Sequence, residues 1–160
     1  MTSLGGEAAA LEIGSAVPDF ELANQFGEPV RLSSLRGSPV VIVFYPFAFS
    51  RICTGELAEI RDRWDVFAAA RAHVLAVSVD SKFALRAFAE AERYEFPLLA
   101  DFWPHGEVAR RYGIFDEASG MARRGTFILD REGILRFRVV NPAGAARDLD
   151  AYSSALAEIG

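Results

Sequence analysis

The sequence contains a single cysteine, Cys53, among its 160 residues. One cysteine cannot form an internal disulfide, so any redox cycle at its thiol must be completed by a second molecule. The chain therefore lacks the disulfide framework that stabilises many small secreted proteins, and a reducing compartment suits it better. We expect a cytoplasmic protein.

Basic stripes and long apolar runs are also missing. The formal net charge is −5 and the arginines are scattered, which argues against a nucleic-acid partner. The longest apolar run, residues 39–49, is about half the length that a membrane-spanning helix requires. Residues 1–16 have neither the basic start nor the apolar centre of a secretory signal. We expect no membrane segment.

The residues that hold metals or nucleotides are scarce as well. The two histidines, His73 and His105, are far apart in the sequence, and with one cysteine they do not give the spacing of a metal site. No glycine-rich phosphate-binding motif occurs. The sequence predicts neither a metal nor another cofactor.

What remains fits one α/β domain over residues 11–160, preceded by a flexible tail over residues 1–10. Apolar and β-branched runs predict strands, and apolar residues at helical spacing predict amphipathic helices. The predicted order is a short strand within 27–39, strand 40–45, helix 53–70, strand 73–80, helix 81–94, strand 96–100, helix 105–113, hairpin 126–140 and helix 149–159. Strands that alternate with helices and end in a hairpin predict a three-layer α/β sandwich with a mixed central sheet.

The helical spacing also predicts which side chains face the core. In the first long helix these are Leu57, Ile60, Trp64 and Phe67. In the second they are Phe83, Ala87 and Phe88, with Ser81 as the N-cap.

A lone cysteine is most often a small buried apolar side chain. Cys53, however, follows a buried strand directly and begins a helix, where free N–H groups and the helix dipole favour a thiolate. Open α/β sheets bind ligands at such strand ends. Ser50 could be only an N-cap or could also place its hydroxyl beside the sulfur, and Pro46 could end the strand or shield the site. Glu56 stands where a C-x-x-C motif would have its second cysteine, which excludes a dithiol enzyme.

The string PFAFSRIC, residues 46–53, resembles the active-site signature of the peroxiredoxins, P-x-x-x-[TS]-x-x-C. Three further segments continue the resemblance, AVPDFEL near the start, FPLLADFWPHGEVARRYG in the middle and RRGTFILDREG near the end. Together they cover roughly residues 11–158. The sequence is most similar to the one-cysteine AhpE group of alkyl hydroperoxide reductases.

The resemblance implies a thioredoxin-like fold and a thiol-dependent peroxidase that reduces hydrogen peroxide, alkyl hydroperoxides or peroxynitrite. It assigns Cys53 as the nucleophile, Ser50 as a hydroxyl bonded to sulfur and peroxide, and Pro46 as a shield. Arg124 becomes the guanidinium of the site, chosen over Arg123 because the family places its arginine immediately before a small residue and the strand.

The resemblance also implies partners. Besides the hydroperoxide, an external thiol must reduce the oxidised cysteine, either mycothiol with a mycoredoxin-like protein or a thioredoxin-like dithiol. A homodimer is expected, with Phe47, Phe49 and Phe102 near its interface. The alternative function is a non-catalytic thioredoxin-like redox sensor or holdase, in which oxidation of Cys53 serves as a signal.

Overall fold

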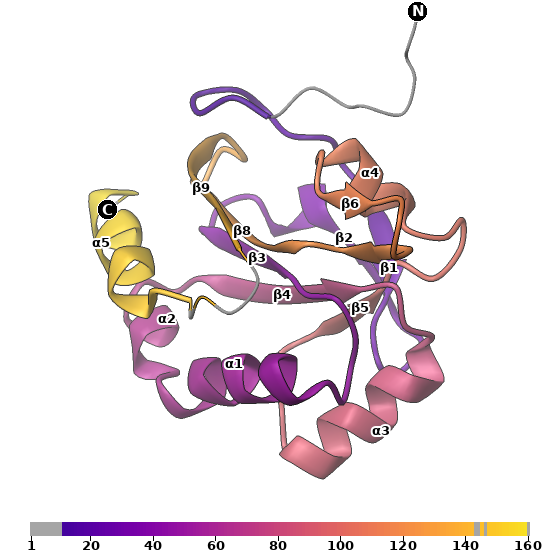
Figure 1. Ribbon diagram of the computed structural model, residues 1–160. Coiled ribbons are helices and arrows are strands. Elements are labelled where there is room, and N and C mark those ends of the chain that lie inside the picture. The colour runs from indigo at the N-terminus through magenta and orange to yellow at the C-terminus, as the bar shows by residue number, and fades with distance from the viewer. Residues whose placement is uncertain (1–10, 143–144, 146, 160) are drawn as a thin grey trace, which may run out of the picture.

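The computed structural model describes residues 11–142, 145 and 147–159, so the expected flexible tail at residues 1–10 lies outside the described residues. Figure 1 shows a central sheet with helices on both of its faces. The strands are β1 (Glu21–Ala23), β2 (Pro29–Arg31), β3 (Val40–Phe44), β4 (His73–Ser78), β5 (Leu98–Ala100), β6 (Phe115–Asp116), β7 (Met121–Ala122), β8 (Arg124–Leu129) and β9 (Leu135–Asn141). The helices are η1 (Leu32–Leu35), α1 (Arg51–Asp62), α2 (Asp65–Ala69), α3 (Lys82–Glu92), α4 (Glu107–Arg111) and α5 (Leu149–Ile159).

The main sheet has seven strands in the order β2-β1-β5-β4-β3-β8-β9. β3 pairs in parallel with β4, and β4 with β5, whereas β8 runs antiparallel to both β3 and β9. β3 lies inside the sheet between β4 and β8, and all five of its residues are buried. The predicted three-layer sandwich with a mixed sheet is therefore confirmed.

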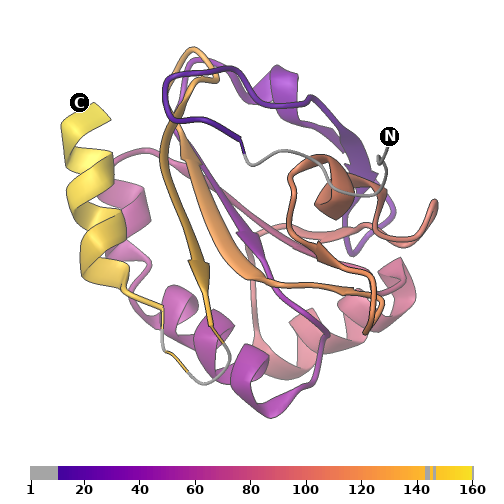
Figure 2. The same cartoon turned by 45° about the horizontal axis from the view of Figure 1, so that its top comes forward.

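Each face of the sheet has its own hydrophobic core. Alternate residues of β3 divide between them: Val41 and Val43 pack in the core beneath α1, α3 and α5, while Val40 and Ile42 pack in the core beneath α4 and η1. Figure 2 shows the sheet between these two layers. Within the described part of the chain, no helix is long and apolar enough to cross a membrane.

One long helix over residues 53–70 was expected, and the structure divides this stretch into α1 and α2. The first helix ends at the C-cap Arg63, whose backbone leaves helical geometry, and the second begins after Trp64. The break lets the Trp64 ring stack on Phe96, with ring centroids 5.9 Å apart. Tertiary packing of an aromatic ring has overridden local helix propensity here.

The second predicted helix is confirmed as α3, and Ser81 caps it by accepting a hydrogen bond from the Ala84 N–H. Its predicted inner face was partly wrong, because Phe83 is 76% exposed and Ala87 is also exposed. Leu85 and Phe88 fill the core instead. The final helix and the hairpin closed by Gly133, whose φ is 83°, agree with the prediction. The short strands β1, β6 and β7 were not predicted.

Candidate functional site

Cys53 lies in the first turn of α1, directly beyond the carboxyl end of β3. Ser50 is the N-cap of this helix, and its hydroxyl oxygen accepts a hydrogen bond from the Cys53 N–H at 3.2 Å. Cys53 is therefore the third helical residue, as predicted, and it is 2% exposed. This position puts the sulfur near the positive end of the helix dipole.

The loop that leads into α1 is fixed by the neighbouring strand. The Ala48 N–H donates to the carboxylate of Asp80 at 2.8 Å, and the Ser78 hydroxyl at the end of β4 donates to the same oxygen at 2.6 Å. Phe49 adopts a left-handed conformation with φ of 67°, and its ring packs on Phe88. Pro46 follows β3 closely and is half-buried. These contacts hold the start of α1, and Cys53 with it, against the carboxyl ends of β3 and β4.

A cluster of three charged side chains lies on the same side of α1. Glu56 is one helical turn beyond Cys53, so both residues share a face of the helix. Its carboxylate accepts hydrogen bonds from Arg124, the first residue of β8, and from the Nε of Arg147 at 3.1 Å. The three side chains are at most 10% exposed. The adjacent Arg123, by contrast, is exposed.

Backbone carbonyls fix both guanidinium groups. Arg124 also donates to the carbonyl oxygens of Pro142, at 2.8 Å, and of Ala145. Arg147 donates to the carbonyl of Phe44 at 2.7 Å and to Thr126 Oγ1 at 3.1 Å. The backbone therefore fixes the orientation of both guanidinium groups before any substrate binds.

The electrostatics of the cluster favour a negative charge nearby. Burial is the largest cause that lowers the pKa of Arg124, followed by repulsion from Arg147, while the charge of Cys53 acts in the opposite direction. Burial also lowers the pKa of Arg147, against the opposing influence of Tyr152 and Cys53. Two guanidinium groups and one carboxylate carry a net charge of about +1, which a Cys53 thiolate would neutralise.

Gly125 explains why a small residue follows Arg124 in the strand. A Cβ atom at this position would lie 2.0 Å from the side chain of Ile114 and 3.3 Å from the Val139 carbonyl oxygen. A larger residue would displace β8 and, with it, the arginine that begins the strand.

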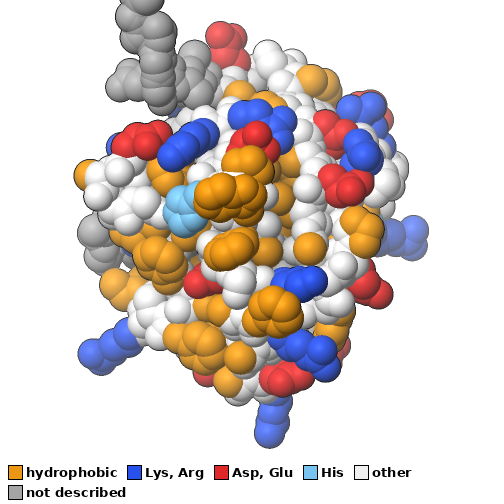
Figure 3. Space-filling view, turned by 90° about the vertical axis from the view of Figure 1, so that its right-hand side faces the viewer, with side chains coloured by type: hydrophobic (Ala, Val, Ile, Leu, Met, Phe, Trp, Pro, Cys, Tyr) orange, Lys and Arg blue, Asp and Glu red, His pale blue; other side chains and the backbone are white. Residues whose placement is uncertain are grey.

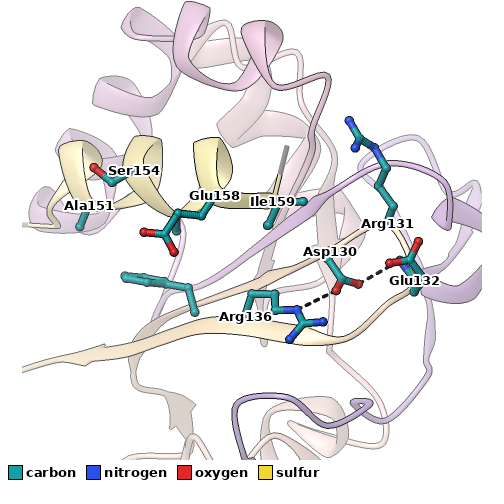
Figure 4. A pocket seen from close by; sticks show the side chains of 10 residues that line it. Asp130, Arg131, Glu132, Arg136, Ala151, Ser154, Glu158 and Ile159 are labelled. Atoms are coloured by element: carbon teal, nitrogen blue, oxygen red, sulfur yellow. Dashed lines mark hydrogen bonds and ion pairs between the residues drawn. The ribbon is translucent and has the colours of Figure 1, made fainter.

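Two cavities lie on the face of the sheet that carries α1 and α5. A hollow of about 330 Å³ borders the charged cluster and is lined by Arg51, Gly55 and Glu59 together with Arg124. A larger one of about 770 Å³ lies between α5 and the β8–β9 hairpin. Figure 4 shows Asp130 bonded there to Arg136, across from Glu158 of α5. Cys53 lines neither cavity, but the smaller one is lined by Glu56, Arg124 and Arg147, so it is the cavity that borders the charged cluster.

The described residues, 11–142, 145 and 147–159, contain no group of three His, Cys, Asp or Glu side chains suited to a metal ion. His105 instead bonds through Nε2 to the Gly120 carbonyl oxygen at 2.7 Å. Cys53, the Ser50 hydroxyl and the two arginines can support nucleophilic chemistry in which negative charge moves away from sulfur.

Comparison with known proteins gives this geometry a family. The sequence profile of the AhpC/TSA family matches residues 13–138. The chain belongs to this family. Among curated AhpC/TSA-type relatives, alkyl hydroperoxide reductase E of Mycobacterium tuberculosis is 42% identical over 150 residues, which cover 93% of this chain and 98% of the relative. Peroxiredoxin 2 of Thermoplasma acidophilum is 36% identical over 86% of this chain and 71% of its own length.

Solved structures agree with the AhpC/TSA assignment. The crystal structure of Enterococcus faecalis AhpC superposes with a TM-score of 0.82 at 31% identity, covering 91% of this chain and 90% of that one. Peroxidoxin BcpB from Mycobacterium tuberculosis gives 0.81 at 35% identity, over 93% and 96%. The thioredoxin-like fold and the resemblance to one-cysteine peroxiredoxins are confirmed. The AhpC/TSA chain is a thiol-dependent peroxidase whose substrate is a hydroperoxide and whose reductant is a thiol.

The sequence analysis placed Pro46, Ser50 and Cys53 together in one loop and helix start, and it chose Arg124 over Arg123 as the arginine of the site. It missed Glu56 as a partner of the arginines, although an acid three residues after the cysteine places it on the same helix face. Arg147 was missed altogether, because it lies in an irregular segment with no recognisable motif and meets Glu56 only through the tertiary fold.

Proposed function

We propose that Cys53 is the peroxidatic nucleophile. The observation that supports this role is its position in the first turn of a helix capped by Ser50, one turn from Glu56, which pairs with Arg124 and Arg147 to leave a net positive charge. The thiolate attacks one peroxide oxygen, an S–O bond forms, and the O–O bond breaks. The departing alkoxide or hydroxide takes a proton and leaves as alcohol or water. The product is a sulfenic acid on Cys53.

The other site residues act on the charge that moves during this step. Ser50 Oγ accepts from the Cys53 N–H, so its own hydrogen is free to bond to the sulfur or to the peroxide. Arg124 stabilises the oxygen that becomes negative, as a fixed donor does in an anion-stabilising site. Pro46 offers no N–H and shields the sulfur on one side.

Regeneration uses two equivalents of external thiol. The first thiol attacks the sulfenic sulfur, which releases water and leaves a mixed disulfide, and the second thiol frees Cys53 as a disulfide forms between the two reductant sulfurs. Cys53 is 2% exposed, so the first turn of α1 must open before a bulky thiol can reach it. We expect mycothiol with a mycoredoxin-like partner or a thioredoxin-like dithiol, in the cytoplasm.

The experiment that tests this role is a single turnover. Reduced protein is mixed with one equivalent of peroxide, and the loss of the free thiol is followed in time. A peroxidatic Cys53 reacts orders of magnitude faster than free cysteine. A rate equal to that of free cysteine would instead favour the redox sensor or holdase and contradict the proposed role.

We also propose a homodimer. Phe47, Phe49 and Phe102 are 40%, 55% and 50% exposed, and Trp103 is 81% exposed. Figure 3 shows hydrophobic side chains gathered on the face formed by α3, α4 and the neighbouring ends of the sheet. Exposed aromatic side chains in such number are typical of an interaction surface, and a biological interface here should bury more than about 1,000 Å² in total.

A further inference from the structure

A cavity of about 490 Å³ lies at the end of the sheet opposite to Cys53. It is bounded by the last turn of α1, the start of β4 and the segment that joins α3 to β5. Cys53 lies in the first turn of α1 and Arg61 in its last, so the two are separated by roughly 12 Å along the helix axis. The volume is in the range of small-molecule sites, and this cavity plays no part in the peroxidase chemistry.

One wall of the cavity is a rigid stack of aromatic rings. The Trp64 and Phe96 rings are nearly parallel, at 8° and 5.9 Å between centroids, and the Tyr94 ring stacks on Phe96 with centroids 5.3 Å apart. Phe96 is 4% exposed and fixed in the core, whereas Trp64 remains 38% exposed. Phe96 therefore fixes the plane of the Trp64 indole, while part of the indole remains exposed to solvent. Such a surface favours a planar aromatic ring.

The two arginines at the rim of the cavity differ in how far their charges are already compensated. Arg61 and Arg93 line it together with His73, and Glu95 is the one acidic lining residue. The Arg61 guanidinium is already bonded to Asp62 at 2.9 Å. Arg93 is exposed and occupies the left-handed C-cap of α3, with φ of 59°. Arg61 also has the Glu92 carboxylate at 4.0 Å, so its charge is compensated. Among the described residues no hydrogen bond or ion pair engages the Arg93 side chain, so Arg93 is the rim guanidinium that remains for an anionic group.

We propose that this cavity binds a small planar aromatic molecule that carries one anionic group, with its ring against Trp64 and its anion toward Arg93. A guanidinium suits either a carboxylate or a phosphate, because its donors match both groups bidentately. Aryl carboxylates and nucleoside monophosphates share this chemistry, and the experiment separates them. The proposal is independent of the role of Cys53, so peroxide consumption does not decide it.

Trp64 supplies the readout. The chain has two tryptophans, and the Trp103→Phe variant leaves Trp64 as the single fluorescent reporter. This variant is titrated with phenylacetate, AMP, adenosine and inorganic phosphate. We expect saturable quenching by phenylacetate or AMP, and binding of adenosine and phosphate at least about tenfold weaker. A response to phenylacetate alone identifies aryl carboxylates as ligands, and a response to AMP alone identifies nucleotides.

Two results of the titration would overturn the proposal. One is the absence of saturable quenching by both phenylacetate and AMP up to about 10 mM, a concentration that detects even weak binding. The other is equal affinity for AMP and adenosine, because the anion would then contribute nothing.

Matched variants locate the site. Arg93→Gln should weaken binding about tenfold or more, and Arg93→Lys should restore part of it, because lysine keeps the positive charge but not the bidentate donors. Both substitutions keep a non-glycine residue at the left-handed cap, so the backbone is perturbed equally in the two variants. Arg86→Gln is the control, because Arg86 lies on the same helix and pairs with Glu90 away from the cavity. Calorimetric titration of these variants, with both tryptophans present, should rank Arg93→Gln alone as defective. If it binds as tightly as Arg86→Gln, the anion is not held at this rim and the proposal is wrong.

Discussion

Removing Arg124 tests how the charged cluster serves Cys53. Arg124 is 7% exposed and donates to Glu56 and to two backbone carbonyls, so it is a fixed cation. In Arg124→Ala, Glu56 and Arg147 remain as a balanced pair, and the net charge of about +1 that faces the thiolate disappears. The loss of one preorganised donor costs about 2.7–4 kcal/mol in the transition state. We therefore expect oxidation of Cys53 to slow by about 100-fold or more.

The fold should tolerate this change. Glu56 keeps its hydrogen bond from Arg147 at 3.1 Å, so no buried charge is left without a partner. We expect a loss of about 1–3 kcal/mol of unfolding free energy, less than the cost of an orphaned buried charge. Urea denaturation measures this loss separately from the reaction rate.

The assay is the second-order rate constant for loss of the Cys53 thiol, measured in a single turnover with hydrogen peroxide. The adjacent Arg123 is exposed, and Arg123→Ala is the matched control, with an expected rate within about twofold of the parent. If Arg124→Ala keeps the parental rate while remaining folded, or if Arg123→Ala is the slower variant, the electrostatic argument is refuted.

Three further predictions concern the thiol, the assembly and pH. Stoichiometric peroxide should add one oxygen to the intact mass, excess peroxide should add more, and Cys53→Ser should consume no peroxide; a Cys53–Cys53 disulfide between chains that turns over without added thiol would contradict this scheme. Light scattering at micromolar concentration should give a dimer mass, and a monomer mass would remove the proposed interface. Burial raises the pKa of Asp101 to about 6 from 3.8, although the Val108 and Ala109 N–H groups donate to it. The folded state therefore holds this proton more tightly than the unfolded state, and the Asp101 contribution to stability should increase, by on the order of 2 kcal/mol, as pH falls from about 7 to 4. Asp101→Asn should lack this contribution in urea denaturation, and an unchanged pH dependence would show that another group titrates.

Local patterns were sufficient for much of the fold and for one half of the site. The run from Val40 to Phe44 is apolar on both faces, which requires a strand covered on two sides, and the structure buries it completely. Ser50 could be placed as an N-cap because capping depends on residues only three apart. For the same reason the position of Cys53 in the first helical turn was correct.

Features that depend on distant contacts were not accessible from the sequence. The helix break before Trp64 depends on a ring at Phe96, and the exposure of Phe83 depends on which face of α3 meets the sheet. Arg147 illustrates this limit most clearly. Its partners lie on β3, on β8 and at Glu56, and no spacing in the sequence connects them.

The same long-range closure has a consequence for synthesis of the chain. Glu56 precedes Arg124 by 68 residues and Arg147 by 91. At a translation rate of about 5–20 residues per second, Arg147 is made roughly 5 to 20 seconds after Glu56. Neither arginine exists until 68 residues after Glu56 have been made, and Arg147 follows 23 residues after Arg124. Glu56 therefore waits for both of its cationic partners, and the charged cluster beside Cys53 is complete only after nearly the whole chain has been made and Arg147 has packed against α1.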